Sequence, residues 1–376
     1  MLLLLKTTKV MATKTITLAT TLQDKVDQRI QAGKARAAIA LKQIQDDSAS
    51  LTDHFGFLGK QGNFNFHSNG VFSTNVDGNK FDINEHAIAQ AGTKLGVPTR
   101  YIKDLAHGQK WERDLAANIL NEHSQYSDRN KVLVRSVNGQ IRGLLSENYR
   151  RLNTSGIYAQ FLDATNSQGA IVVDAHLNEQ KSYLETLIPQ MFEIVTPNNG
   201  IVHVLFGARI SNSDFGAGSL EVRTFMLQAV CTNGMVRDTA LKQVHRGSKI
   251  DDMLLASQRT VDLDTQAQAS FVNDMVTDLL SAASIKKQIN SIQETSAKTI
   301  DLDKELKLLP KAGMMKGEVD LVGRMLMENN PNDGVQGIGT AWKMSQAITA
   351  LARDTKNESR RRDLEEIGGT FLTKIK

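Results

Sequence analysis

One stretch of the chain, residues 131–247, constrains the fold more than any other. It reads as a run of β-strands separated by short polar loops. Two of its expected strands, 202–210 and 220–230, are long and rich in β-branched and aromatic residues, and the polar, glycine-containing segment 211–219 joins them. Because two long strands with such a short connection pair antiparallel, this stretch predicts a central, mainly antiparallel sheet.

The chain is expected to be helical on both sides of this sheet. Residues 18–50 contain no proline and predict an exposed, alanine-rich helix in which Gly33 is the only weak point. From about residue 250, apolar side chains recur every four residues, as at Phe271, Met275 and Leu279. The predicted fold class is therefore α+β, with a central mainly antiparallel sheet, a helical N-terminal segment and a helical C-terminal region. The chain is expected to divide into four parts. They are a flexible N-terminus (residues 1–17), a helical segment with a small β-rich and helical unit (18–125), the central sheet domain (126–250) and the helical C-terminal region (251–376).

Short-range signals predict where several elements begin and turn. Asp77-Gly78 and Asn138-Gly139 tolerate the positive φ angles of tight hairpin turns. Asn84 precedes an apolar-periodic segment and is expected to be the N-cap of a helix.

Composition narrows the class of protein. A chain of 376 residues, 40% hydrophobic and 23% charged, can bury a core in two or three units, as soluble globular proteins do. One cysteine, Cys231, excludes an internal disulfide and a cysteine zinc site, and favours a reducing, cytoplasmic setting. No apolar run long enough to cross a membrane is found, and no cofactor or metal is expected.

Charge is concentrated in the first part of the sheet region. The segment 131–151 holds five basic residues and one acid, an excess of +4 that equals the excess of the whole chain. Those basic residues are Lys131, Arg135, Arg142, Arg150 and Arg151, with Tyr149 beside the last pair. Arginines along a sheet face with an occasional ring predict a path for a single nucleic-acid strand, in which guanidinium groups hold phosphates and the ring stacks on a base. The simpler reading is a solvated face whose arginines pair with Glu147, Glu221 or Asp238.

A second basic group would extend this path. Its members are Arg223, Arg237, Lys242, His245, Arg246 and Lys249, of which Arg223, Arg246 and Lys249 are the expected phosphate contacts. A third run, Arg360 to Arg362, precedes acidic residues and is interpreted as a solvated helix face.

Two catalytic or metal-binding arrangements stay open. Cys231, Asn233 and His245 would form a thiol site if they met, with Asp214 in the neighbouring loop. A metal site would need Asp174, His176 and His203 on neighbouring strands. For the thiol arrangement, the simpler interpretation is a cysteine that packs as a small apolar residue. For the metal arrangement, it is histidines half-buried in a sheet.

Several short strings, read in order, resemble a phage and plasmid protein family known only as domain of unknown function number 932. The matching pieces are Leu95-Gly96-Val97-Pro98 with Tyr101, Val134-Arg135, Ile141 to Ser146 with Tyr149-Arg150, Asn212-Ser213 with Gly216, Ser219 and Leu220, Cys231 to Met235, His245, Gly339 to Trp342, and Gln346 to Thr349. The resemblance covers about residues 55–355 and departs from the family pattern at Ala350 to Asp354. It implies a mobile-element origin and a cytoplasmic setting, that of the host if phage-encoded, but no established activity.

Three functions follow as hypotheses. The first is non-catalytic binding of nucleic acid, single-stranded DNA above all, in phage or plasmid replication or recombination; the order of hairpin, helix and long strands is similar to that of phage single-strand annealing proteins. The second is a structural or host-interaction protein that assembles through apolar stripes on its C-terminal helices, 251–295 and 340–375, with self-association left open. The third is an enzyme using the 211–245 region.

Overall fold

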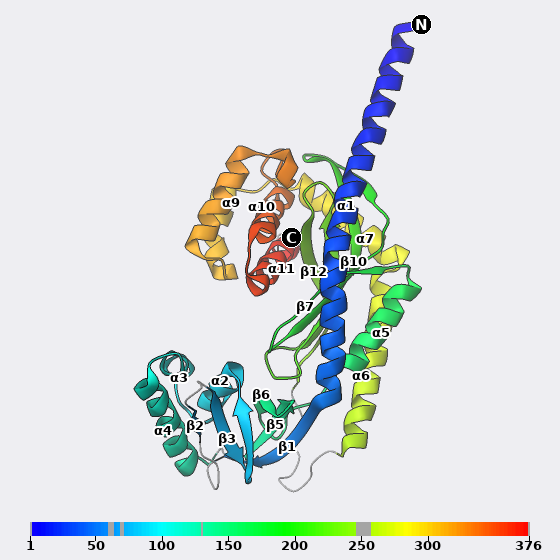
Figure 1. Ribbon diagram of the computed structural model, residues 1–376. Coiled ribbons are helices and arrows are strands. Elements are labelled where there is room, and N and C mark those ends of the chain that lie inside the picture. The colour runs from blue at the N-terminus through cyan, green and yellow to red at the C-terminus, as the bar shows by residue number, and fades with distance from the viewer. Residues whose placement is uncertain (1, 59–63, 68–70, 129–130, 246–256, 375–376) are drawn as a thin grey trace.

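The computed structural model describes residues 2–58, 64–67, 71–128, 131–245 and 257–374. The protein has an α+β fold with two mostly antiparallel sheets and helices at both ends, which confirms the predicted class (Figure 1). The strands form two sheets and not a single central one, and each sheet has its own set of covering helices.

The first sheet forms a small lobe at one end of the molecule (Figure 1). Its strands lie in the order β1-β5-β6-β4-β3-β2, and every pair is antiparallel except β4 with β6. Their bounds are Leu51–Phe57 (β1), Asn65–Phe66 (β2), Phe72–Val76 (β3), Asn79–Ile83 (β4), Lys131–Val137 (β5) and Gln140–Leu145 (β6). Three helices pack on this sheet: α2 (Glu85–Lys94), α3 (Thr99–Ala106) and α4 (Lys110–Tyr126).

The second sheet is larger and wholly antiparallel. Its strands lie in the order β12-β11-β10-β8-β7, and β9 pairs with the first part of β10. Their bounds are Ile171–Leu177 (β7), Ser182–Leu187 (β8), Phe192–Thr196 (β9), Gly200–Asn212 (β10), Leu220–Gln228 (β11) and Asn233–Gln243 (β12). The two long strands predicted from the sequence are β10 and β11, and they pair antiparallel as expected.

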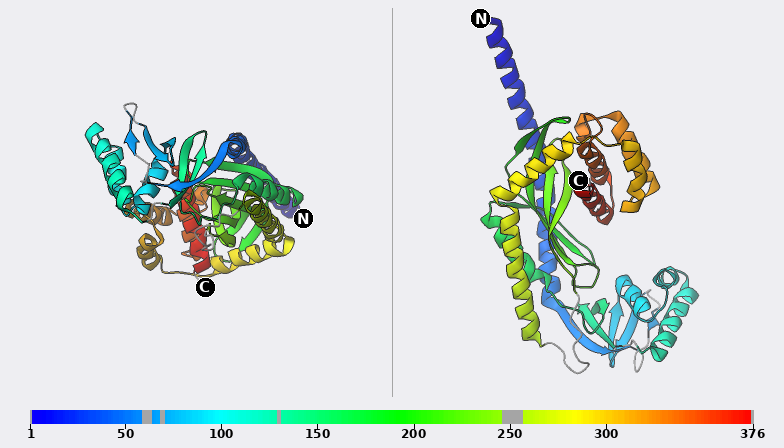
Figure 2. Two further views of the ribbon diagram at one scale, coloured as in Figure 1. Left: turned by 90° about the horizontal axis from the view of Figure 1, so that it is seen from below. Right: turned by 180° about the vertical axis from the view of Figure 1, so that it is seen from behind.

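Most of the remaining helices lie around the second sheet, and α8 and α9 pack beyond it, in the same core as α10 (Figures 1 and 2). They are α1 (Leu2–Ser50), α5 (Thr154–Ser167), α6 (Gln258–Leu279), α7 (Ala282–Ala297), α8 (Leu302–Leu308), α9 (Lys316–Glu328), α10 (Ala341–Asp354) and α11 (Glu358–Lys374), with short 3-10 turns η1 (Leu309–Ala312) and η2 (Pro331–Asp333). No helix among the residues described is both long and apolar enough to span a bilayer.

Two boundaries differ from the sequence expectation. The α1 backbone is helical from Leu2, so residues 2–17 belong to the same helix as the residues that follow them. The β5–β6 hairpin belongs to the first sheet, because β1 pairs with β5 and β4 pairs with β6. The predicted central domain is therefore divided between the two sheets after β6.

The predicted turns and cap are present. Asp77 and Asn138 have φ of 46° and 53°, and each is followed by a glycine with positive φ at the tip of a hairpin. Asn84 caps α2, and its side-chain oxygen accepts from the Ala87 N–H at 2.9 Å. These local signals were sufficient because each depends only on residues within the turn itself.

Helix α1 lies against the edge strand β7, and Gly33 is the reason it can come so close. A Cβ at Gly33 would lie 1.7 Å from the carbonyl oxygen of Val173 in β7. The glycine that weakens the helix by propensity therefore permits direct contact between helix backbone and strand backbone.

Candidate functional site

A cluster of buried polar side chains, which we call the polar junction, joins the two sheets. Arg135 of β5 is its centre and is 1% exposed. Its guanidinium donates to Asp53 Oδ1 on β1 (2.9 Å), to the Asp214 carbonyl oxygen in the β10–β11 loop (2.9 Å) and to Asn153 Oδ1 at the start of α5 (3.0 Å). Arg151 donates to the other oxygen of Asp53 at 3.2 Å. One arginine therefore connects a strand of the first sheet to a loop of the second.

His245 closes the other side of the junction. Its ring stacks parallel to Tyr149, with centroids 5.2 Å apart, and the Tyr149 hydroxyl donates to the Ser213 carbonyl at 3.0 Å. His245 Nδ1 lies 3.0 Å from the Arg150 carbonyl oxygen, and Nε2 lies 2.8 Å from Asn212 Oδ1. A neutral imidazole donates through only one nitrogen, so one of these two contacts lacks a proton unless the ring is charged.

Burial decides the charge states here. It lowers the pKa of His245 to about 4, and the positive charges of Arg135 and Arg150 act in the same direction. It also raises the pKa of Asp214, against the opposing effects of Arg135 and of the hydrogen bond from the Thr154 N–H. At neutral pH the imidazole is therefore uncharged.

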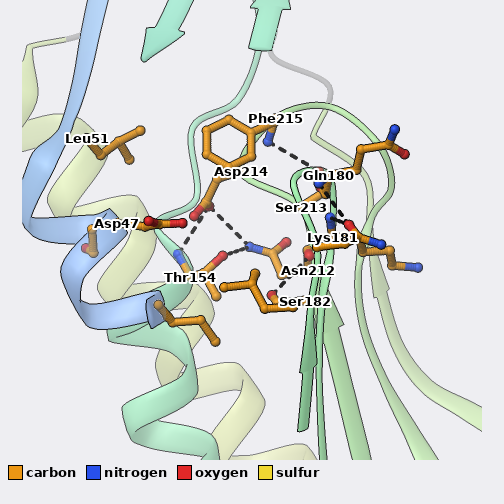
Figure 3. Close-up of a pocket in the computed structure, with 14 residues that line it drawn as sticks. Asp47, Leu51, Thr154, Gln180, Lys181, Ser182, Asn212, Ser213, Asp214 and Phe215 are labelled. Carbon is orange, nitrogen blue, oxygen red and sulfur yellow. Dashed lines mark hydrogen bonds between the residues drawn. The ribbon is translucent and has the colours of Figure 1, made fainter. Parts of the chain in front are cut away.

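A small pocket borders the junction, with the Asp214 carboxyl among its lining (Figure 3). Asp47 and Leu51 line one side, from α1 and β1, and Lys181 and Phe215 line the other. The free space is about 30 Å³, which is room for one or two waters. This geometry suits a connection between two sheets better than a substrate site.

A second buried cluster, the charged row, crosses four strands of the second sheet. Asp174 of β7, Glu185 of β8, Arg209 of β10 and Arg223 of β11 are successive register partners. The two acids are thus adjacent, and the two arginines follow them. Glu185 and Arg209 pair with each other within the sheet at 2.6 Å, and further partners come from outside it. Such partners matter because burial penalises a charge that is not compensated.

Helix α11 supplies those partners. Arg362, 1% exposed, lies 3.5 Å from Asp174 and pairs with Glu185, and Glu365 pairs with Arg209. Burial alone would raise the pKa of Glu365, but the charges of Arg209 and Arg362 outweigh it and lower that pKa. The interpretation of the 360–362 run as a solvated face is therefore wrong for Arg362. It is also wrong for Arg361, which is buried and lies 3.4 Å from Asp174.

The arginines expected to form a nucleic-acid path do not lie open along a common groove. Each of the described ones meets a carboxylate: Arg135 and Arg151 meet Asp53, Arg142 meets Asp47, Arg150 meets Asp264, and Arg223 meets Glu221 and Glu366. Tyr149 is covered by the junction, and Lys131 is half-buried opposite Phe57 on β1. Arg246 and Lys249 lie outside the described residues. Nucleic-acid binding stays a prediction, and these contacts give it no support.

Arg237 and Lys242 of the second basic group also have polar partners within the protein. Arg237 is buried and donates to the Ser291 hydroxyl at 2.7 Å, and Lys242 pairs with Glu221 at 3.0 Å. The pairing of Arg223 with Glu221 is the simpler alternative that the sequence offered.

The thiol arrangement does not assemble. Cys231 lies in the turn at one end of the β11–β12 hairpin, and His245 follows the other end of β12. The ten residue steps along β12 separate the two ends by about 30 Å. Asp214 does lie near His245, because both contact Asn212.

The metal arrangement does not assemble either. Strand β8 separates β7, with Asp174 and His176, from β10, and His203 lies at the far end of β10 opposite Glu193. Within the described part of the chain, no three His, Cys, Asp or Glu side chains gather as metal ligands.

Sequence reasoning missed the carboxylates that organise the junction. Asp47 lies near the end of a long helix and Asp53 in the strand after it, with no motif around either. Their partners lie more than 80 residues further along the chain. Only the pairing of β1 with β5, which no local signal predicts, brings them together.

Three comparisons of this chain, with protein-family models, with curated proteins and with solved structures, find no match. The resemblance to domain of unknown function number 932 therefore remains a prediction.

Proposed function

We propose that the protein is a non-catalytic assembly protein that acts as a complex of its own copies, through an exposed face of α6. The observation that carries the proposal is an apolar row on the solvent side of that helix. Leu263 and Phe271 are 55% and 52% exposed, and exposed Ala267 lies midway between them. Residues four apart share one face of a helix, so the three make a continuous stripe.

The opposite face of α6 holds the helix rigidly in place. Val272 and Val276 are buried against α5 and the second sheet, and the Asp264 carboxylate accepts two hydrogen bonds from Arg150, at 2.6 and 2.7 Å. A fixed helix that presents a contiguous apolar stripe to solvent is typical of a protein interaction site.

The other helices expected to expose such a stripe do not do so. Every residue of α10 from Ala341 to Ala352 is buried, and Leu364 of α11 lies in the same core as Met344 and Ile348. The assembly hypothesis therefore rests on α6 and not on the 340–375 region.

Sedimentation velocity over a range of concentrations tests the proposal. The parent should self-associate, and the Leu263→Gln/Phe271→Gln variant should sediment as a monomer at the same concentrations. Trp111→Gln is the matched control, because Trp111 is a 62% exposed aromatic residue on α4 of the other lobe, and it should leave association unchanged. A monomeric parent, or a Leu263/Phe271 variant that associates as the parent does, contradicts the proposal.

A further inference from the structure

The exposed face of α6 is symmetrical about Ala267. Leu263 precedes Ala267 by one helical turn, and Phe271 follows it by one turn. Arg259 lies about two turns before Ala267, and Asp274 lies about two turns after it. All five side chains are exposed. This α6 row therefore has a positive charge at one end, a negative charge at the other end and apolar side chains between them.

Such a row is complementary to an antiparallel copy of itself. A twofold axis that passes beside Ala267, at right angles to the helix, places residues at equal distances from Ala267 opposite each other. Leu263 of each copy then lies opposite Phe271 of the other. Arg259 of each copy lies within one residue step of Asp274 of the other. Ala267 meets its own copy at the axis, and its methyl group is small enough for the spacing of about 8–10 Å at which helices pack.

A groove beside α6 fits the same arrangement. It has a volume of about 350 Å³ and runs between α5 and one flank of α6, where Gln266, Ser270 and Asn273 line it. Leu263 precedes Gln266 by three residues and Ser270 by seven, so it lies on the same flank of the helix. A twofold axis across the helix keeps that flank on the same side in both copies. Leu263 of one copy therefore reaches the groove of the other beside Ser270.

The two ends of the row are open to a second copy. Within the part of the chain that the structure describes, neither Arg259 nor Asp274 forms an ion pair. Helices α5 and α6 lie along one side of the molecule, and the lobe of the first sheet projects on the other side (Figure 2). A second copy can therefore approach α6 without meeting that lobe.

We propose that the α6 row binds the α6 row of a second copy, antiparallel about a twofold axis at Ala267, with Arg259 of each copy paired to Asp274 of the other. This inference rests on the proposed function, since it names the surface that the α6 face binds. The same residues supply both halves of the interface, so the assembly closes as a dimer.

A cysteine placed on the axis tests this geometry. The chain has one cysteine of its own, Cys231, which is buried. Ala267→Cys should form a disulfide between copies under mild oxidation, because a residue at the axis lies close to its own copy. Ser270→Cys is the matched control on the same exposed face. Three residues from the axis, the two copies of residue 270 lie about 9 Å apart along the helices, beyond the reach of a disulfide.

Non-reducing gel electrophoresis of the full-length variants measures the cross-linked dimer. We expect at least about fivefold more of it from Ala267→Cys than from Ser270→Cys, since the two positions differ in distance from the axis and not in exposure.

Charge reversal tests the end contacts by sedimentation equilibrium. Arg259→Asp and Asp274→Arg should each raise the dimer dissociation constant about tenfold, because each places like charges opposite one another at both ends of the interface. The double variant restores opposite charges and should return to within about threefold of the parent. Asp262→Arg changes an exposed acid on α6 outside the row and should have no effect.

The outcomes separate this inference from the function it rests on. If Leu263→Gln/Phe271→Gln abolishes association but Ala267→Cys cross-links no better than Ser270→Cys, α6 binds another surface of the second copy, and the inference fails alone. If both charge reversals weaken association and the double variant does not recover, the pairing of Arg259 with Asp274 is wrong. A parent that never associates ends both proposals.

Discussion

Glu185 and Arg209 face each other across β8 and β10, with the carboxylate 2.6 Å from the guanidinium and both side chains fully buried. Arg362 of α11 pairs with the same carboxylate, so Glu185 is a partner that the two arginines share. The sheet face under α11 is therefore held by charge and not by apolar packing alone. Removing Glu185 leaves Arg209 with Glu365, and Arg362 with Asp174 and Glu365, so the two buried arginines lose the carboxylate that they share.

We expect Glu185→Gln to reduce the free energy of unfolding by about 3–5 kcal/mol, the usual cost of breaking a buried ion pair from one side. Urea denaturation followed by circular dichroism measures this loss. Asp363→Asn is the matched control on α11, since that carboxylate is largely exposed and 3.5 Å from Arg360, and it should change stability by less than about 1 kcal/mol. Equal effects of the two substitutions would show that the charged row does not hold α11.

The contacts of Arg135 in the polar junction predict a similar loss of stability. Arg135→Met keeps an unbranched apolar chain in place of the aliphatic part of arginine but leaves Asp53 with only Arg151, and removes the donors to Asp214 and Asn153. We expect a loss of about 3 kcal/mol or more in the free energy of unfolding. Lys80→Met, an exposed cation on β4 of the same sheet, should be nearly neutral. A stable, fully folded Arg135→Met protein would mean that the two sheets are joined by other contacts.

His245 predicts how stability depends on pH. The folded-state pKa of about 4 lies below the ordinary value of 6.5, so the unfolded chain takes up a proton that the folded chain refuses. The contribution of His245 is therefore fully present above pH 6.5 and is lost as pH falls toward 4, by at most about 3 kcal/mol. The difference in unfolding free energy between the parent and His245→Gln, measured from pH 7 to 4.5, isolates this group from the carboxylates. The parent's advantage should shrink across that range, and a constant difference would rule out a lowered pKa for His245.

The sequence predicted elements whose signals are local. The turns at Asn138-Gly139 and Asp77-Gly78, the Asn84 cap and the antiparallel pairing of β10 with β11 all depend on residues close together in the chain. The division into two sheets was not predictable in this way. It depends on β1 and β4 pairing with the β5–β6 hairpin, which are contacts between distant segments.

The same limit applies to the charged residues. A basic run followed by acids, as at 360–366, has the composition of a solvated helix, and only the row of Asp174, Glu185 and Arg209 beneath it makes the run buried. Arginines on predicted strands likewise indicate a path for phosphates, because the sequence does not show which carboxylates pair with them in the fold. The sign of a charge can be read from the sequence, but its partner depends on tertiary structure.

Gly33 shows the clearest difference between a prediction from helix propensity and a prediction from the structure. Helix propensity alone predicts that Gly33→Ala stabilises α1 by about 1 kcal/mol. The structure predicts the opposite sign, because the new Cβ would lie 1.7 Å from the Val173 carbonyl oxygen and would push α1 away from β7. Gly323→Ala is the matched control, since Gly323 lies in the interior of α9 and its new methyl would meet only Leu306 at an ordinary 3.7 Å. Thermal unfolding should show a lower midpoint for Gly33→Ala and an equal or higher one for Gly323→Ala. A stabilised Gly33→Ala protein would mean that α1 does not rest on β7 in solution.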